Sequence, residues 1–127
     1  RISRAFERYQ GRGNRMYIEQ NSCIKIGSNC SISSGVNIVG HDSVRWALSG
    51  GKQNYENGPI SIGNNCFIGT NAFITKGVTI GNHCLVGANA VVTKSFPDYS
   101  IVLGIPGKLA GKVTVTDDDV HFEYFDK

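Results

Sequence analysis

The sequence is poor in proline and tryptophan and has no long apolar run: 3 prolines and 1 tryptophan occur among 127 residues. No apolar stretch approaches the roughly 20 residues that a membrane-spanning helix needs, and no signal peptide is visible. We therefore expect no transmembrane segment and a cytoplasmic location. The chain also lacks a C-x-x-C pair. Its four cysteines therefore do not have the spacing of a typical zinc site, and we expect no metal.

The chain also has little net charge, because its basic and acidic residues nearly balance. The formal net charge is +3, too low and too dispersed to indicate a nucleic-acid partner. The arginines at the start of the chain suit a membrane surface or an anionic partner, but such residues more often form a solvated face or a partner contact, which is our interpretation; they are Arg1, Arg4, Arg8, Arg12 and Arg15. Hydrophobic residues make up 40% and charged residues 18%, which is typical of a globular chain, and the length predicts one domain over residues 1–127.

A six-residue period is the strongest pattern in the sequence. From residue 62 the chain reads IGNNCF, IGTNAF, ITKGVT, IGNHCL, VGANAV and VTKSFP. The leading residue is aliphatic each time: Ile62, Ile68, Ile74, Ile80, Val86 and Val92, with Ile26, Ile32 and Ile38 in the same frame earlier. Since side chains alternate along a strand, the first and fifth positions point to the same side, which we expect to be the interior. Cys30, Cys66 and Cys84 are fifth positions, so we interpret them as small buried hydrophobic residues.

The fourth position of each six predicts a backbone corner. It is occupied by Asn29, Gly35, Asn65, Asn71, Gly77, His83 and Asn89. Glycine, asparagine and histidine tolerate the positive φ that a tight corner requires. Each six is therefore expected to be a short strand followed by a corner, and stacked sixes form a parallel β-solenoid.

The repeat resembles the hexapeptide-repeat acyltransferases over roughly residues 18–113. The stretch GPISIGNNCFIGTNAFITKGVTIGNHCLVGANAVVTKSFPDYSIVLGIPGKL is most similar to the galactoside, maltose and surface-polysaccharide O-acetyltransferases. The resemblance implies an all-β, left-handed parallel β-helix that packs as a homotrimer. It also implies acetyl-CoA as co-substrate and a hydroxyl of a sugar or polysaccharide precursor as acceptor. We expect a lead-in over residues 1–17, the solenoid over 18–103 and a C-terminal tail over 104–127.

The repeat is interrupted over residues 40–58, which we interpret as an inserted loop. Acetyl transfer to a hydroxyl needs a general base, and a histidine, with a reference pKa of about 6.5, suits that role. The same side chain can then protonate the departing thiolate. In the family a histidine at the start of this loop does this work, and His41 occupies the matching place. Asp42 or Glu56 would orient its imidazole by accepting the other N–H.

The resemblance further implies where the acyl donor lies. Thr70 matches a hydroxyl-bearing position near the pantetheine arm, and Ala88 matches a small position whose backbone faces it. Thr93 and Lys94 match the family's Thr-Lys pair at the nucleotide end. Lys108, in GIPGKL, matches the basic residue of the family's turn, and both lysines suit a phosphate group.

Three other interpretations stay open. The acceptor is alternatively an amino sugar or an antibiotic, which would make the chain an N-acetyltransferase or a xenobiotic acetyltransferase. A metalloenzyme like the γ-class carbonic anhydrases needs three converging histidines, whereas His41, His83 and His121 are unpaired in sequence. A non-catalytic scaffold is disfavoured by the histidine in the interrupted repeat. Trp46 and Tyr55 either stack on a sugar or pack the loop against a neighbouring subunit.

Overall fold

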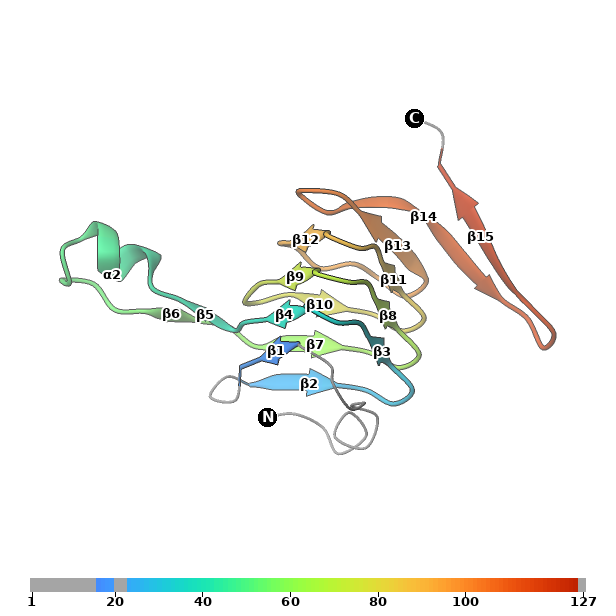
Figure 1. The fold of residues 1–127 in the computed structure, drawn as a ribbon, viewed down its shortest axis with the longest axis horizontal. Coiled ribbons are helices and arrows are strands. Elements are labelled where there is room, and N and C mark those ends of the chain that lie inside the picture. Colours follow the sequence, from blue (N-terminus) through green and yellow to red (C-terminus); the bar gives the residue numbers. More distant parts are fainter. Residues whose placement is uncertain (1–15, 20–22, 126–127) are drawn as a thin grey trace.

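The repeat forms a parallel β-helix in the computed structural model, which describes residues 16–19 and 23–125 (Figure 1). Face 1 contains β1 (Tyr17–Ile18), β4 (Asn37–Ile38), β9 (Phe73–Ile74) and β12 (Val91–Val92). Face 2 contains β2 (Ile24–Ile26), β7 (Ile60–Ile62) and β10 (Thr79–Ile80). Face 3 contains β3 (Ser31–Ile32), β8 (Phe67–Ile68), β11 (Leu85–Val86) and β13 (Ser100–Leu103). Every pairing among these strands is parallel, which confirms the predicted solenoid. The basic start, Arg1 to Arg15, lies outside the described residues.

The interior is built from the first and fifth positions of the sixes, as predicted. All nine leading residues are buried, from Ile26 to Val92, and the least buried of them, Ile32, is only 4% exposed. The three cysteines at fifth positions are each 2% exposed and lie in the same core. The neighbouring thiols of Cys30 and Cys84, together with burial, raise the pKa of Cys66. Cys66 therefore stays a neutral thiol and packs as a small apolar group.

Positive φ occurs at every predicted corner: Asn29, Gly35, Asn65, Asn71, Gly77, His83 and Asn89. The φ of His83 is 57°, and this value confirms its interpretation as a corner residue. Tyr99 has a φ of 65° although no corner is predicted there. The six-residue frame is shortened by two residues here. Val86 pairs with Ile68, eighteen positions earlier, but with Val102, only sixteen positions later.

The corners stack into three edges, which we name by their contents. The loop edge joins faces 1 and 2 and carries the inserted loop and Lys76. The His83 edge joins faces 2 and 3, and the Thr70 edge joins faces 3 and 1. Side chains continue the stacking on the His83 edge, where the Asn82 side-chain oxygen accepts the Asn64 backbone N–H at 2.7 Å and the Asp98 oxygen accepts that of Asn82 at 2.8 Å.

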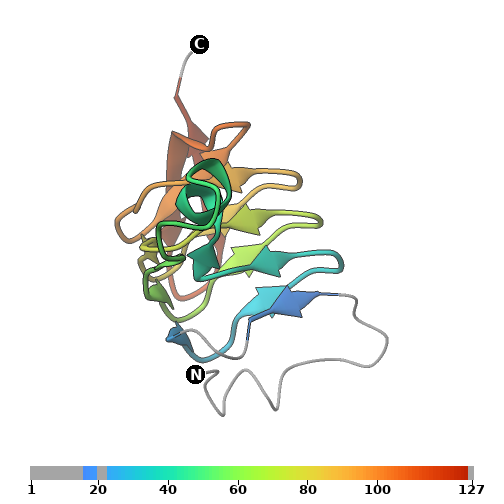
Figure 2. The same cartoon turned by 90° about the vertical axis from the view of Figure 1, so that its left-hand side faces the viewer.

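The inserted loop projects from the loop edge without disturbing the coils (Figures 1 and 2). Ile38 pairs with Ile74, 36 positions later, whereas Ile74 pairs with Val92, 18 positions later. The insertion therefore has the length of one coil. The loop contains β5 (His41–Asp42), α2 (Val44–Leu48) and β6 (Glu56–Asn57), and β5 pairs with β6 in antiparallel fashion. Among the described residues no helix is long and apolar enough to cross a bilayer.

The predicted C-terminal tail contains a β-hairpin. β14 (Lys108–Val115) pairs with β13 and with β15 (Val120–Tyr124), both in antiparallel fashion, so the hairpin extends face 3 beyond the coils. Figure 1 shows β14 and β15 leaving the solenoid on the side opposite the inserted loop. The boundary near residue 103 thus marks the end of the parallel coils and not the end of ordered structure.

Candidate active site

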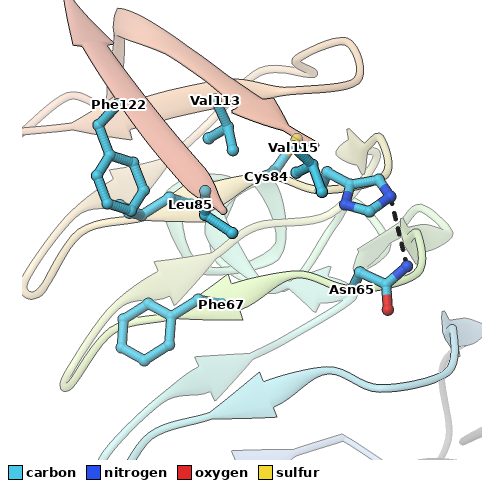
Figure 3. Close-up of a pocket in the computed structure, with 9 residues that line it drawn as sticks. Asn65, Phe67, Cys84, Leu85, Val113, Val115 and Phe122 are labelled. Atoms are coloured by element: carbon cyan, nitrogen blue, oxygen red, sulfur yellow. Dashed lines mark hydrogen bonds between the residues drawn. The ribbon is translucent and has the colours of Figure 1, made fainter. Parts of the chain in front are cut away.

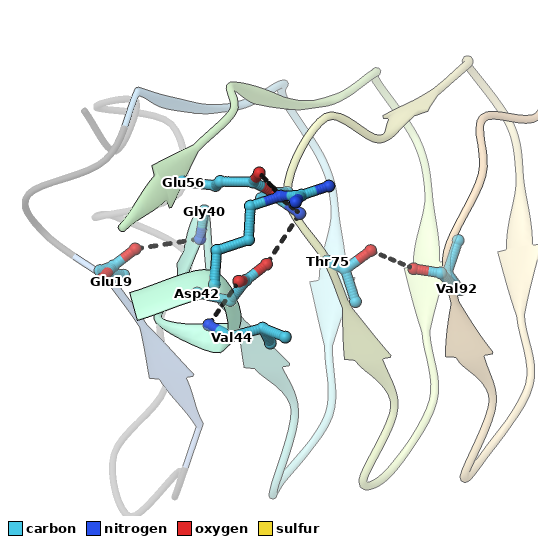
Figure 4. A network of polar contacts seen from close by, with 9 residues as sticks. Glu19, Gly40, Asp42, Val44, Glu56, Thr75 and Val92 are labelled. Atoms are coloured by element: carbon cyan, nitrogen blue, oxygen red, sulfur yellow. Dashed lines mark hydrogen bonds and ion pairs between the residues drawn. The ribbon is translucent and has the colours of Figure 1, made fainter. Parts of the chain in front are cut away.

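His41 lies at the base of the inserted loop, where β5 leaves the loop edge. Its Nδ1 is in contact with Oε2 of Glu19. Oε1 of Glu19 accepts the backbone N–H of Gly40 at 3.0 Å (Figure 4). The side chain of Glu19 is 8% exposed and that of His41 is 33% exposed. A buried carboxylate therefore holds both the ring of the histidine and the backbone that precedes it.

Glu19 is a residue that the sequence reasoning missed. It follows β1, whose Ile18 pairs with Ile38, twenty positions later. The six-residue frame therefore does not extend back to this coil, and nothing in the period places Glu19 beneath the loop. The one available signal is an acidic side chain directly after an aliphatic residue in the coil that precedes the interruption.

Asp42 and Glu56 do not contact the imidazole; they face each other across the β5–β6 pair and share Lys76. The Lys76 ammonium lies 2.7 Å from Asp42 Oδ2 and 3.5 Å from Glu56 Oε1. Glu56 also accepts a hydrogen bond from Arg45 at 2.6 Å, and Asp42 accepts the backbone N–H of Val44 at 3.0 Å (Figure 4). Both carboxylates thus hold the loop, while Glu19 has the place that we expected one of them to take.

The charges of this group perturb one another. The Lys76 ammonium, aided by the Val44 backbone N–H, lowers the pKa of Asp42 below its ordinary value of 3.8. The Asp42 carboxylate in turn raises the pKa of Lys76 above its ordinary value of 10.5. Asp42 and Lys76 are therefore both ionised over the whole neutral range.

The two aromatic residues of the loop pack in a row with His41. The Tyr55 ring lies parallel to the imidazole, with centroids 5.9 Å apart and an interplanar angle of 3°. Trp46 meets Tyr55 edge-on at 5.8 Å. Trp46 and Tyr55 remain 45% and 49% exposed, so the row is a partly open wall beside the histidine.

The five donor positions are divided between two edges. Thr70 and Ala88 stack on the Thr70 edge, where the Thr70 carbonyl accepts the N–H of Asn89 at 2.8 Å. Lys108 follows the turn that stacks on the same edge, because the N–H of Gly107 bonds to the Val91 carbonyl at 2.7 Å.

Thr93 and Lys94 lie at the other side of face 1, on the loop edge two coils above the base of the loop. The Lys94 ammonium lies 5.8 Å from the centroid of the Phe96 ring. All five residues predicted at the donor site are exposed: Thr70, Ala88, Thr93, Lys94 and Lys108. One chain therefore does not bring them together on a single edge.

The other two histidines lie away from this site. His83 stacks on Tyr99, with centroids 4.9 Å apart, and its Nε2 lies 3.4 Å from Nδ2 of Asn65. His121 lies on β15, where its Nε2 is 3.4 Å from Asp119. Within residues 16–19 and 23–125, no group of three or more histidine, cysteine or acidic side chains is arranged to hold a metal ion.

An apolar groove of about 420 Å³ lies on the opposite side of the coils, between face 3 and the β14–β15 hairpin. Phe67 and Leu85 form its floor, and Val113, Val115 and Phe122 face them from the hairpin (Figure 3). His41 is not among the residues that line it. The groove is therefore separate from the candidate active site on the loop edge.

Known proteins share this repeat and this fold. Residues 59–94 match the family described as the hexapeptide repeat of succinyl-transferase. Protein CapG of Staphylococcus aureus is 49% identical over 86 residues, which are 67% of this chain and 50% of CapG.

Two solved structures are similar over most of the chain. A galactoside acetyltransferase in complex with coenzyme A is 31% identical with a TM-score of 0.70, and the match covers 76% of this chain and 48% of that one. A hexapeptide-repeat-containing acetyltransferase from Vibrio cholerae is 26% identical with a TM-score of 0.67, over 77% of this chain and 56% of that one. The chain thus spans about half the length of these relatives. The predicted left-handed parallel β-helix and the resemblance to the hexapeptide-repeat family are confirmed.

Proposed function

Because this chain is a hexapeptide-repeat parallel β-helix like those acetyltransferases, we propose that it is an acetyl-CoA-dependent O-acetyltransferase. The proposed acceptor is a hydroxyl of a sugar or of a polysaccharide precursor. The similarity to a galactoside acetyltransferase supports a sugar acceptor, and the coenzyme A in that complex supports the donor. A simple galactoside offers hydroxyls and no amine, which favours O-acetylation over N-acetylation. Acetyl-CoA is a metabolite of the cytoplasm, and the proposal therefore places the reaction there.

The observation that carries this proposal is the contact between His41 and the buried Glu19. A carboxylate that accepts the Nδ1–H keeps the neutral ring in the tautomer whose Nε2 has a lone pair. In the proposed reaction, Nε2 of His41 takes the proton of the acceptor hydroxyl as that oxygen bonds to the acetyl carbon. The carbon–sulfur bond breaks, and His41 returns the proton to the departing thiolate. The products are the acetyl ester and free coenzyme A, and His41 ends neutral as it began.

The donor positions suit the phosphate and pantetheine groups of coenzyme A. Lys94 and Lys108 offer exposed ammonium groups, which bind phosphate as point charges. Thr70 and Ala88 offer a narrow edge of small side chains and backbone, which suits the amide-bearing pantetheine arm. These assignments rest on the family resemblance together with the exposure of all four side chains.

We extend the proposal to a homotrimer. In such a trimer the Thr70 edge of one copy would lie beside the loop edge of the next, with a groove between them. The predicted donor positions, which lie on two different edges of a single chain, would then line the same groove. Exposed aromatic side chains on the faces, Phe67 at 44% and Phe73 at 39%, support burial against a neighbour. Cyclic symmetry closes such head-to-tail contacts. Light scattering that finds a stable monomer at working concentration would contradict this assembly.

The function is tested with purified protein, acetyl-CoA and a panel of sugars, amino sugars and antibiotics, with released thiol as the signal. We expect acetyl-CoA to raise the melting temperature and a sugar hydroxyl to give thiol release. His41→Ala should lower kcat by roughly 10²–10⁴-fold with little change in acetyl-CoA binding. His83→Asn is the matched control, because asparagine also tolerates the corner, and it should leave rate and fold unchanged. Acetylation of amines alone would refute the O-acetyl assignment.

A further inference from the structure

Lys76 makes two ionic contacts with the inserted loop, although it belongs to the coil above the base of that loop. It lies on the loop edge between β9 and β10, next to the positive-φ corner at Gly77. A lysine at this position of the six is expected to extend into solvent. Its side chain is instead only 31% exposed, because it reaches to both strands of the β5–β6 pair.

The loop has few other means of keeping its position. No residue of α2 is buried, and Val44 and Leu48 are 56% and 84% exposed. Within residues 16–19 and 23–125, the hydrogen bonds and ion pairs that we find between residues 41–57 and the coils are those at Glu19 and Lys76. Glu19 contacts the loop from the coil below, and Lys76 contacts it from the coil above.

The charges around Lys76 explain why its removal would matter. Asp42 and Glu56 are paired residues of an antiparallel ladder, where two like charges directly opposite repel each other. The Lys76 ammonium contacts both carboxylates and offsets their repulsion, and Arg45 contacts Glu56 as well. Without Lys76, two carboxylates would face each other with one cation, and the pair of strands that begins with His41 would lose its contact with the upper coil.

We propose that Lys76 is a positioning residue, which holds the β5–β6 pair against the solenoid so that His41 stays in contact with Glu19. The consequence for acetyl transfer rests on the proposed function. The positional statement does not, because it concerns only the loop and the coils.

The position of the loop can be measured without any substrate. Trp46 is the single tryptophan of the chain and lies in the loop itself, so its fluorescence reports on this segment alone. We expect Lys76→Met to increase acrylamide quenching and lower the anisotropy of Trp46, with the circular dichroism spectrum unchanged. Lys76→Arg restores the contacts and should behave like the wild type. Lys25→Met is the control, since Lys25 is an exposed lysine of β2 on face 2.

Kinetics supply the second measurement. Lys76→Met should lower kcat roughly 3–10-fold with the KM for acetyl-CoA unchanged, because the base is displaced and the donor site is not. If Lys76→Met fails to fold, the wild type is titrated with sodium chloride, which screens exposed ion pairs and should itself increase Trp46 quenching. Unchanged Trp46 signals in the folded variant, or in high salt, would overturn the proposal. Absence of acetyl transfer by the wild type would instead refute the proposed function and leave the fluorescence test intact.

Discussion

The partner of His41 offers the sharpest test of the proposed chemistry, and Glu19→Gln isolates it. A glutamine has the same shape, and its carbonyl oxygen can still accept the N–H of Gly40, which the glutamate accepts at 3.0 Å. Its amide nitrogen then faces Nδ1 of His41 and donates to it. To accept this hydrogen bond, Nδ1 of the neutral imidazole must have its lone pair free, so the ring proton moves to Nε2. Nε2 can then no longer accept the proton of the acceptor hydroxyl.

The size of the effect follows from this exchange of tautomers. We expect kcat to fall by about 10²–10³-fold, which corresponds to about 3–4 kcal/mol of barrier. The free energy of unfolding should fall by only about 1 kcal/mol, since the buried group stays hydrogen-bonded to Gly40. Loss of kcat without loss of fold is therefore the expected pattern. Glu19→Ala, which leaves the Gly40 N–H without this acceptor, should lose both.

Thiol release gives kcat, and nitrogen-15 chemical shifts of the His41 ring give the tautomer. In the background of His41→Ala, the further change Glu19→Gln should have no effect on the rate, because its action passes through the imidazole. The reasoning fails if Glu19→Gln keeps kcat within about threefold of the wild type while the proton stays on Nδ1.

Three further outcomes are expected. Ile74→Ala removes a fully buried side chain from the centre of the core and should cost about 2–5 kcal/mol in urea unfolding; a smaller loss would mean that the coils collapse around the cavity. Gly63→Ala puts a Cβ 2.8 Å from the carbonyl carbon of Gly81 in the next coil and should cost about 1–3 kcal/mol, so an unchanged melting temperature would contradict close coil stacking there. The Asp42–Lys76 pair stabilises the loop above the ordinary pKa of Asp42 and below that of Lys76, and is lost as pH falls through the lowered value or rises through the raised one. Trp46 quenching should therefore be flat between about pH 5 and pH 9, and a step inside that window would exclude this pair as the cause.

The coils could be predicted because each six shows both a core position and a corner position. The aliphatic first residue is buried in the core, and the fourth residue, such as Asn65 or His83, tolerates the positive φ of the corner. Both signals are local, and eighteen-residue stacking then follows from repetition. The place of His41 at the base of the loop was likewise predicted, because the interruption of the period is itself visible.

What could not be predicted depends on contacts between segments that do not share the frame. Glu19 precedes the first regular six, and Lys76 lies next to a corner, where a lysine is usually exposed. Their contacts with the loop are therefore visible in the structure and not in the sequence. Asp42 and Glu56 were expected beside the imidazole because they are near it in sequence. The antiparallel pairing of β5 with β6 turns both toward Lys76 instead.

The C-terminal hairpin was missed for a different reason. Val113 and Val115 alternate with polar residues, as do Val120, Phe122 and Tyr124, and three consecutive aspartates lie between the two runs. Apolar residues at every second position on both sides of a turn are typical of an antiparallel hairpin. A search for six-residue repeats does not detect this pattern, because the hairpin lies after the last six.

The backbone N–H of Gly58 bonds to the Gly40 carbonyl at 2.9 Å, so the two ends of the inserted loop meet. A chain that joined Val39 directly to Gly58 would have the same spacing between successive coils as the uninterrupted part of the solenoid. The loop can thus be shortened or lengthened between Gly40 and Gly58 while every strand of the coils keeps its partner. A change of length or sequence in the part of the loop beyond His41 is therefore accommodated between these two ends, without a change of register between the strands of the solenoid.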